Sequence, residues 1–494
     1  MPHVVTQSCC SDASCVYACP VNCIHPTPDE PDFLTAEMLH IDPQSCVDCG
    51  ACVTACPVDA IVPAGKLDEA QQPFLQINAD FYKQPRTYPL LAPLVASSSA
   101  RRDRGALRVA IVGSGPAAMY VADEVLKQPG AQVDVFERLP RPYGLVRAGV
   151  APDHRKTKHV TTLFDAIARE RGFEFFLDVE VGQRISHEQL LESHHAVVYA
   201  VGASSDRRLT IPGADLPGVA SATEFVGWYN GHPDHAHRSF DLSRRRVVIV
   251  GNGNVALDVA RILLTDPERL ADTDIAANAL AALRKSAVEE VVIVARRGLA
   301  ESAFTVPEIT GLVAHDDFDV VVDRTGIDSA PDGSDHAVRT KLAALAGLPD
   351  VANHHEGSRR IVFRYVSSPT VICGTDAVTG VEFDRGGARD IVETSLVLTS
   401  IGYRGVPVPD LPFDPATGTV PNVGGRVTGQ PGTYVAGWIK RGPSGFIGTN
   451  KSCAHETVER LIADYNDDLL PAPQHDRSDL RKLLAGRKVD RVRV

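Results

Sequence analysis

The chain has 494 residues, of which 44% are apolar and 23% are charged, and its formal net charge at pH 7 is −12. This length allows about three domains with substantial cores, and the composition excludes a fibrous or a disordered protein. Residues 1–4 carry no basic or apolar leader, and no apolar run approaches the roughly 18 residues of a membrane span, so we expect no membrane partner.

The acidic charge is concentrated near the start of the chain. Residues 1–80 hold 11 Asp and Glu, and Lys66 is their only Lys or Arg. A compact acidic region disfavours nucleic acid as a partner and favours docking on a basic rim. Any one cation of that rim could equally be an ordinary solvated charge. The candidates for the rim are Arg141, Arg147, Arg155, Lys156, Lys158, Lys440 and Arg441.

Two runs of cysteines lie in this acidic region, which holds nine of the 11 cysteines. The second run has the spacing of a bacterial ferredoxin, in which three thiolates bind one iron–sulfur cluster and the fourth binds another. The first run repeats the same intervals, with Asp12 in place of one thiolate. The second run is Cys46, Cys49, Cys52 and Cys56, followed by Pro57, and the first is Cys9, Asp12, Cys15 and Cys19, followed by Pro20.

The two runs predict two interleaved clusters. One is a 4Fe-4S cluster, and the other is a 3Fe-4S cluster or a 4Fe-4S cluster with an oxygen ligand on its fourth iron. Cys10 could replace Cys9, and Cys23 is interpreted as a packing thiol outside both runs. Zinc is the alternative metal, because paired Cys-x2-Cys is also a zinc signature. The expected ligands are Cys19, Cys46, Cys49 and Cys52 at the 4Fe-4S cluster, and Cys9, Cys15 and Cys56 at the other.

The cysteine region resembles a bacterial two-cluster ferredoxin over roughly residues 1–65. The rest of the chain is poor in cysteine and has no disulfide framework, which favours the reducing cytoplasm as its location. Residues 81–106 contain several prolines and a serine run without an apolar period, and we expect them to form a linker.

A first nucleotide-binding unit follows the linker. Residues 108–112 are an expected strand and residues 120–127 an expected helix, joined by a tight turn that aims backbone N–H groups at a pyrophosphate. Glu137, at the end of the next strand, suits an unphosphorylated ribose, so the unit is expected to bind FAD or NAD. The turn includes Gly113, Gly115, Pro116 and Ala118.

A second unit has its expected strand at residues 246–250 and its helix at residues 257–264. The following strand ends just before Arg296 and Arg297, whose guanidinium groups can clamp a 2′-phosphate. This unit is therefore expected to bind NADPH, although a surface basic pair is the alternative. The turn of the unit includes Asn252, Gly253, Asn254 and Val255.

Strands that end at Gly202 and Gly402 mark two crossings between a discontinuous FAD domain and an inserted NADPH domain. The predicted fold class is an α/β flavoprotein with two dinucleotide-binding, Rossmann-like domains, preceded by a small α+β bacterial ferredoxin domain. The predicted limits are 1–80 for the ferredoxin-like domain, 81–106 for the linker, 107–203 and 401–494 for the FAD-binding domain, and 204–400 for the NADPH-binding domain.

Four blocks, at residues 142–154, 251–261, 296–305 and 437–448, resemble the adrenodoxin-reductase-like ferredoxin–NADP reductases, in particular the bacterial form fused to an N-terminal ferredoxin. The resemblance covers the whole chain. It implies an enzyme in which hydride passes from NADPH to FAD and electrons then leave singly to the clusters of the fused or a separate ferredoxin. The implied FAD contacts are Pro116, Glu137, Leu145, Val181, Trp438, Gly445, Phe446 and Ile447; the implied NADPH contacts are Asn252, Gly253, Asn254, Val255, Arg296, Arg297, Glu308 and Arg207.

The same resemblance makes His154 the active-site histidine near the nicotinamide, against the alternative of a packed or surface histidine. Members of the family often carry a second glutamate one helical turn after Glu308, and Gly311 occupies that position here. Two other functions stay open. One is an electron-supplying subunit similar to the small subunit of glutamate synthase, and the other is an iron–sulfur redox sensor, which Asp12 invites.

Overall fold

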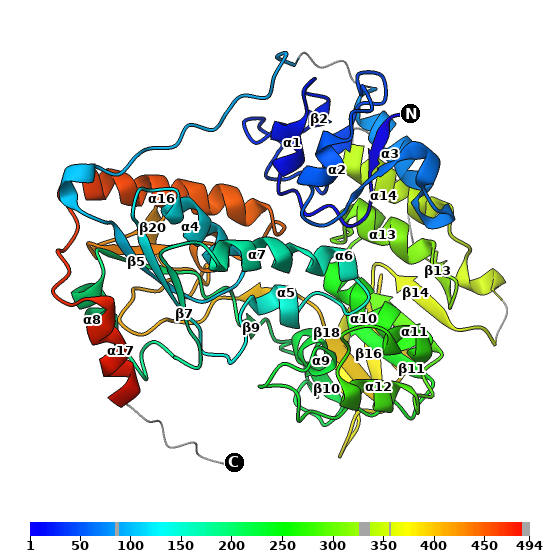
Figure 1. The fold of residues 1–494 in the computed structure, drawn as a ribbon. Helices are drawn as coiled ribbons and strands as arrows, with labels where there is room; N and C mark the ends of the chain where they lie inside the picture. Colours follow the sequence, from blue (N-terminus) through cyan, green and yellow to red (C-terminus); the bar gives the residue numbers. More distant parts are fainter. Residues whose placement is uncertain (84–87, 326–335, 355–356, 487–494) are drawn as a thin grey trace.

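The computed structural model of the protein describes residues 1–83, 88–325, 336–354 and 357–486. Figure 1 shows a small N-terminal lobe and two larger α/β parts, each built around its own sheet. We call residues 1–83 the ferredoxin lobe. No helix within the described ranges has the length and apolar character needed to cross a membrane.

The ferredoxin lobe folds as two similar halves. Helices α1 (Ser14–Ala18) and α2 (Ala51–Ala55) both start after a residue in the left-handed region, Ala13 at φ 63° and Gly50 at φ 74°. Both end at a cysteine, Cys19 or Cys56, with φ −77° and an extended ψ of 116° or 117°. The repeat of the cysteine spacing is therefore also a repeat of the backbone.

The lobe is closed by two small antiparallel sheets and one longer helix. The sheets pair β1 (His3–Val5) with β4 (Ile61–Pro63) and β2 (Ile24–His25) with β3 (His40–Ile41). Helix α3 (Pro73–Phe81) buries Asn78, whose Oδ1 accepts from the backbone N–H groups of Val5 and Ile41. Short 3₁₀ turns lie at Ala64–Lys66 and Glu69–Gln71.

The first large part is built on a seven-stranded sheet in the order β20-β21-β22-β8-β5-β6-β7. The strands from β22 to β7 are parallel. The apolar residues of β22, β8, β5 and β6 are buried, as expected of a sheet covered on both faces, and those of the edge strand β7 are half-buried. The strands are β5 (Arg108–Val112), β6 (Gln132–Phe136), β7 (Phe173–Phe176), β8 (Ala196–Tyr199), β20 (Asn422–Val423), β21 (Arg426–Val427) and β22 (Thr433–Val435). The helices are α4 (Pro116–Leu126), α5 (Gly144–Ala148), α6 (Arg155–Lys158), α7 (Val160–Ala168), α8 (His187–Ser193), α15 (Trp438–Arg441), α16 (Thr449–Asn466) and α17 (Arg477–Gly486).

The second large part is built on a fully parallel six-stranded sheet in the order β10-β18-β11-β12-β14-β13. Its strands are β10 (Val219–Ser221), β11 (Arg246–Val250), β12 (Glu290–Val294), β13 (Asp319–Asp323), β14 (Arg360–Arg364) and β18 (Leu396–Thr399). An antiparallel sheet of β15 (Ser368–Cys373), β16 (Gly380–Arg385) and β17 (Ala388–Glu393) adjoins it. The helices are α9 (Ala222–Tyr229), α10 (Asn254–Leu264), α11 (Pro267–Ala271), α12 (Ala277–Leu283), α13 (Val306–Val313) and α14 (His336–Ala346).

The chain crosses twice between the two sheets, and the crossings lie side by side. Strand β9 (Ser205–Asp206) on the outward crossing pairs antiparallel with β19 (Tyr403–Arg404) on the return. Strands β5 to β8, before residue 204, and β20 to β22, after residue 420, thus share the seven-stranded sheet, and all strands of the six-stranded sheet lie between them in the chain. The exact domain limits stay a prediction.

The segment expected to be a linker is attached at both ends. The ring of Tyr88 stacks on His25 of the lobe at 3.4 Å, and the backbone N–H of Ser98 donates to Glu459 of α16 at 2.8 Å. In Figure 1 this segment runs from the top of the lobe across to the seven-stranded part, while the lobe itself lies over α13 and α14. The lobe is therefore seated on the rest of the molecule.

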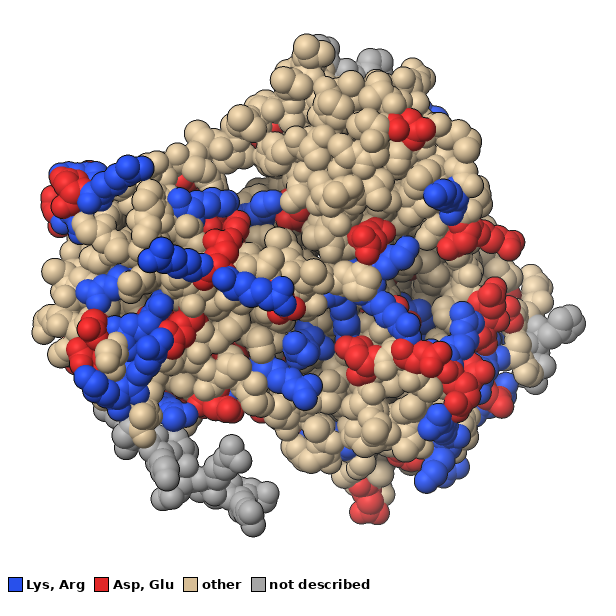
Figure 2. Space-filling view, viewed as in Figure 1, with Lys and Arg blue, Asp and Glu red and all other residues tan. Residues whose placement is uncertain are grey.

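The ion pairs of the structure can be compared with the basic docking rim expected from the sequence. Figure 2 shows few charged side chains on the visible face of the lobe, and Lys and Arg gathered across the centre of the view, where Figure 1 draws α5 to α7. Two rim candidates, Lys158 and Lys440, pair with Asp274 and Glu456 outside the lobe. Carboxylates of the lobe pair instead with other residues: Asp12 with Lys451, Glu37 with Lys341, and Asp59 with His159.

Candidate functional site

The first glycine turn joins β5 to α4 in a way that requires glycine. Gly113 has φ 99°, and a Cβ built there would stand 2.6 Å from the carbonyl oxygen of Ala200. Pro116 takes the first position of α4, where its missing N–H costs nothing. Ala118 is fully buried in this helix. The turn therefore presents the start of α4 in the geometry that binds a pyrophosphate.

The acid of the first unit is already hydrogen-bonded by the protein. Glu137 is buried and accepts from the backbone N–H and the hydroxyl of Ser114, at 3.1 and 2.6 Å, and from the N–H of Leu139 at 2.9 Å. A carboxylate has about four acceptor positions. One position remains for a ribose hydroxyl, so the site fits the adenosine half of FAD.

The C-terminal FAD candidates lie close to the start of α4. A Cβ on Gly437 would stand 2.7 Å from the side chain of Ala117, so the backbone before Trp438 contacts α4 directly. Gly445 has φ 79°, and the N–H of Phe446 donates to Thr449 Oγ1 at 2.9 Å. The segment of Gly445, Phe446 and Ile447 is thereby fixed just before α16.

The other FAD candidates are less closely joined to that segment. Trp438 donates from its indole N–H to the carbonyl of Ser444 at 3.1 Å. Val181 packs on the core that contains Phe136, at the end of β6. Leu145 lies on α5 with 43% of its side chain exposed, so it is accessible to a ligand.

The second glycine turn repeats the construction of the first. Gly251 has φ 114°, and a Cβ there would stand 2.1 Å from the carbonyl oxygen of Ser400. Gly253 precedes α10, and Asn254 Oδ1 accepts from the N–H of Thr305 at 2.8 Å. Asn252 is nearly buried and Val255 packs on the domain core. The turn and the segment before α13 are thus held together.

The three arginines expected to contact NADPH lie at the protein surface. Arg296 and Arg297 follow β12 after one intervening residue, and both are exposed. Arg207 is also exposed and lies at the crossing between the sheets, where its N–H donates to the carbonyl of Gly402 at 3.0 Å. All three guanidinium groups are therefore accessible to a solvent-borne nucleotide.

His154 lies in a cluster with two carboxyl groups from the NADPH side. Its Nε2 is 3.5 Å from Asp258 Oδ1 on α10 and 3.8 Å from Glu308 Oε2 on α13, and each side chain is only about 15% exposed. Burial raises the pKa of Glu308. Our sequence reasoning missed Asp258, although its position four residues after Asn254 puts it on the same helix face. The alternative of a surface histidine is therefore wrong.

An ion pair beside this cluster joins the two large parts. Arg261 on α10 donates from Nε to Asp153 Oδ2 at 2.6 Å and from Nη2 to Asp153 Oδ1 at 3.0 Å, and also to Asp258 at 2.7 Å. Burial opposes ionisation of Asp153, but Arg261 outweighs it and holds the pKa of this carboxyl well below its usual range. The pair fixes residue 154 relative to α10.

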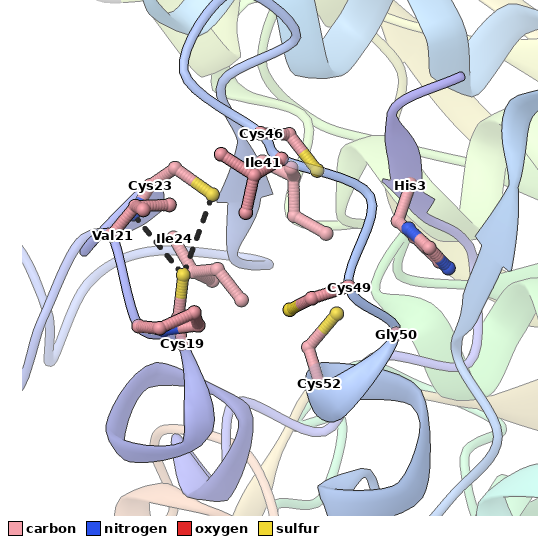
Figure 3. A pocket seen from close by; sticks show the side chains of 12 residues that line it. His3, Cys19, Val21, Cys23, Ile24, Ile41, Cys46, Cys49, Gly50 and Cys52 are labelled. Carbon is pink, nitrogen blue, oxygen red and sulfur yellow. Dashed lines mark hydrogen bonds between the residues drawn. The ribbon is translucent and has the colours of Figure 1, made fainter.

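Five cysteines of the lobe line one small pocket (Figure 3). Four are the expected 4Fe-4S ligands. The fifth is Cys23, which lines the pocket with its Sγ 3.5 Å from that of Cys19 and also packs in the core of the lobe. Hydrogen bonds from Cys23 lower the pKa of Cys19 to about 5, which favours the thiolate that binds metal. The expected ligands in the pocket are Cys19, Cys46, Cys49 and Cys52.

The spacing of the sulfur atoms argues against zinc. Around a single tetrahedral zinc, with Zn–S bonds of about 2.3 Å, the sulfur atoms lie about 3.8 Å apart. Within the described ranges, no three cysteines bring their sulfur atoms within 4.8 Å of one another. A wider group fits a cluster, in which each thiolate binds a different iron.

The second cysteine group lies deeper, between the lobe and the seven-stranded part. Cys9 Sγ accepts from the N–H of Leu39 at 3.5 Å, and Cys56 Sγ from that of Ala60 at 3.3 Å. Burial raises the pKa of the Cys9 thiol to about 11, and nearby Cys56 adds to this shift. Burial likewise raises the pKa of Cys15, with Cys9 and Cys56 adding to it. Three thiols in a confined site fit one iron–sulfur cluster.

Asp12 and Cys10 lie at the contact between the ferredoxin lobe and the seven-stranded part. The Asp12 carboxylate accepts from Ser14 N–H at 3.1 Å through Oδ1, and from Tyr120 hydroxyl at 3.1 Å and Lys451 Nζ at 3.2 Å through Oδ2. Cys10 is 5% exposed and packs in the core around α4. The protein itself thus uses both oxygens of Asp12, and the choice of Cys9 over Cys10 as a cluster ligand stays a prediction.

Known proteins match both halves of the chain. Residues 107–305 match the family model described as pyridine nucleotide-disulphide oxidoreductase, and residues 39–62 match the 4Fe-4S binding domain. A Mycobacterium tuberculosis protein named as a probable ferredoxin/ferredoxin–NADP reductase is 56% identical, over 99% of this chain and 88% of its own. The chain belongs to this ferredoxin/ferredoxin–NADP reductase family.

Other relatives match a large part of the chain. NADPH-ferredoxin reductase FprA of M. tuberculosis is 48% identical, over 72% of this chain and 83% of its own. A solved structure of that FprA in complex with NADPH has a TM-score of 0.74 and 45% identity, and the match covers 78% of this chain and 90% of the other.

These relatives confirm the predicted fold class and the predicted enzyme, a ferredoxin–NADP reductase with an FAD- and NADP-binding oxidoreductase unit and a 4Fe-4S domain. They do not support the glutamate synthase-like subunit or the redox sensor as readings of the chain. The identity of each contact residue stays a prediction.

Proposed function

We propose that the fused lobe is the direct electron acceptor of the reductase half of this family member. When bound, FAD takes a hydride from NADPH and passes electrons singly to iron–sulfur clusters. The residues proposed to bind FAD are those of the first glycine turn with Glu137, Leu145, Val181, Trp438 and residues 445–447. Those proposed for NADPH are Arg207, residues 252–255, Arg296, Arg297 and Glu308, with His154 beside the nicotinamide.

The observation that carries the proposal is the contact at Gly448. Its N–H donates to the carbonyl of Cys10 at 2.8 Å, and it directly follows the segment proposed to bind FAD. Cys9 and Cys56 pack against the core around α4 as well as the core of the lobe. The cysteine group nearer to the flavin site is therefore that of Cys9, Cys15 and Cys56.

The other cysteine group lies on the outer side of the lobe. Cys49 is exposed, and the neighbouring Val47 is 57% exposed. We propose that a separate ferredoxin or another single-electron acceptor approaches this edge. With ten net negative charges in residues 1–80, from 11 acidic residues and one lysine, the lobe favours an acceptor with a basic face.

The cluster nearer to the flavin is proposed to contain three irons. Three thiolates serve it, and the carboxylate of Asp12 is occupied by Ser14, Tyr120 and Lys451. The four thiolates of the outer group suit a 4Fe-4S cluster. Cysteines kept as thiolates for clusters also favour the reducing cytoplasm as the location of the enzyme.

Anaerobic titration of the full-length holoenzyme with NADPH tests this function. We expect the flavin absorbance and then the iron–sulfur absorbance to bleach, with the electron paramagnetic resonance signals of the clusters changing in step. Flavin that reduces while both clusters stay oxidised, even with a low-potential mediator, would argue against the lobe as acceptor. A chemical reductant that bleaches the clusters provides the control for their competence.

A further inference from the structure

A notch in helix α13 receives a side chain of the ferredoxin lobe. A Cβ built on Gly311 would stand 2.3 Å from both Nε2 and Oε1 of Gln7, closer than real side chains approach. Gly311 lies inside Val306–Val313, where alanine would favour the helix more than glycine does. The glycine is thus unfavourable for the helix, but it leaves the space that the amide of Gln7 occupies.

The side chain in this notch reaches the active-site cluster. Gln7 Nε2 donates to Glu308 Oε2 at 3.3 Å. The same oxygen of Glu308 is 3.8 Å from Nε2 of His154. One residue of the lobe therefore contacts the carboxyl group that lies beside the proposed nicotinamide site.

A second contact fixes the position of the start of α13 against the lobe. Val306 begins the helix, so its N–H has no partner within the helix. Glu37 Oε2 accepts from this N–H at 2.6 Å, and Lys341 Nζ donates to Glu37 Oε1 at 3.0 Å and to the carbonyl of Phe304 at 3.2 Å. Lys341 is 8% exposed, so the network is buried. The lobe holds both the start and the middle of α13.

We propose that Gln7 is a positioning residue of the reductase site: seated against Gly311, it holds the Glu308 carboxyl toward His154. The inference rests on the proposed function, because it gives the lobe a role where NADPH donates its electrons. The charged or titratable groups that face Glu308 are His154 from the loop before α6 and Asp258 and Arg261 from α10. Gln7 adds an uncharged hydrogen-bond donor from the ferredoxin lobe.

Kinetics of the full-length holoenzyme test the positioning role. Gln7→Ala removes the donor, and we expect NADPH to reduce the flavin about five-fold more slowly, with a shifted pH profile and an unchanged iron content. Gln7→Glu puts a second carboxyl beside Glu308, so the pair holds a proton to higher pH and the profile moves upward. Gln44→Ala, at an exposed glutamine of the lobe, should match the wild type. Wild-type rates and pH profiles in both Gln7 variants would overturn the proposal.

A double-mutant cycle tests the notch without measuring activity. In the cluster-loaded wild type, Gly311→Ala should lower the denaturant midpoint of unfolding, because the new methyl group displaces Gln7. In the Gln7→Ala background the same change should raise the midpoint, since only the helix preference remains. Effects of equal sign and size in the two backgrounds would show that Gln7 does not occupy the notch.

The two proposals fail differently. If the lobe is not the electron acceptor, the wild-type clusters stay oxidised under NADPH while the coupling between residues 7 and 311 persists. If Gln7 has no positioning role, NADPH still reduces the wild-type clusters, and the flavin of the Gln7→Ala variant is reduced at the wild-type rate with the wild-type pH profile.

Discussion

The backbone of Gly448 lies against the backbone of Ser11: a Cβ at residue 448 would stand 2.1 Å from the Ser11 carbonyl oxygen and 2.3 Å from the N–H nitrogen of Asp12. Ser11 lies between the two cysteine positions Cys10 and Cys15, and Gly448 precedes α16. A side chain at residue 448 would therefore push the lobe away from the segment proposed to bind FAD.

Gly448→Ala is expected to slow electron transfer from the flavin to the lobe. The rate of electron transfer falls as donor and acceptor move apart, so a lobe displaced from the flavin segment receives its electrons more slowly. Mixing the holoenzyme with NADPH in a stopped-flow instrument separates the bleaching of the flavin from that of the clusters. Gly347→Ala, at a glycine with only ordinary contacts nearby, is the matched control. Cluster bleaching as fast as in the wild type would mean that Gly448 does not set the distance.

Arg296→Ala combined with Arg297→Ala is expected to abolish the preference for NADPH over NADH. Each charge-assisted bond to a phosphate contributes about 1.5 to 3 kcal/mol, so the loss of both brings the two nucleotides close to parity. The ratio of kcat/KM for the two nucleotides measures this. Arg389→Ala removes another exposed arginine of the inserted part and should leave the ratio unchanged. An unchanged ratio in the double variant would place the 2′-phosphate elsewhere.

Asp12→Asn is expected to weaken the contact between the lobe and α4 and to leave the second cluster intact. The amide loses the charge that Lys451 and Tyr120 face, which costs about 1 to 3 kcal/mol in the free energy of unfolding. Electron paramagnetic resonance of the oxidised protein should keep the wild-type signal of the second cluster. A changed signal would mean that Asp12 is a ligand. Asp12→Cys should instead favour a four-iron cluster, because it supplies the missing thiolate.

Asp153→Asn is expected to destabilise the protein in a manner that depends on pH. Removing one partner of a buried ion pair costs about 3 to 5 kcal/mol. Because Arg261 lowers the pKa of Asp153 in the folded state, the contribution of the pair is present above the ordinary value of about 3.9 and is lost as the pH falls below it.

Denaturant unfolding of wild type and Asp153→Asn at several pH values measures this difference, which should be largest at pH 7 and shrink below pH 4. The control is Glu268→Gln, which breaks an exposed pair with Arg284 and should leave the stability nearly unchanged at every pH. An equal loss of stability at all pH values would contradict the assignment of the low pKa to Asp153.

The local features of the sequence predicted the local features of the fold. The turns at Gly113 and Gly251 and the two cysteine runs depend on residues close together in the chain, so their spacing determined the structure that forms. The two sheets and their crossing strands also followed from the positions of Gly202 and Gly402.

Contacts between distant segments could not be predicted. Gln7 and Glu308 are separated by 301 positions and Asp12 and Lys451 by 439, and no periodic pattern relates such pairs. The pairing of Lys158 and Lys440 with carboxylates outside the lobe could not be predicted for the same reason, since net charge indicates that a partner is basic and not which cations it meets. The closeness of Cys23 to Cys19 could not be predicted either, because Cys23 belongs to neither cysteine run.

Gly311 and Gly448, which have no side chains, allow the ferredoxin lobe to pack closely against the reductase part of the chain. A reductase that binds a separate ferredoxin only transiently has no fused lobe packed against it. Bulkier residues are therefore tolerated at both positions. The residues at these two positions thus offer a simple criterion for distinguishing, among homologous chains, reductases with a fused ferredoxin from those that use a separate one.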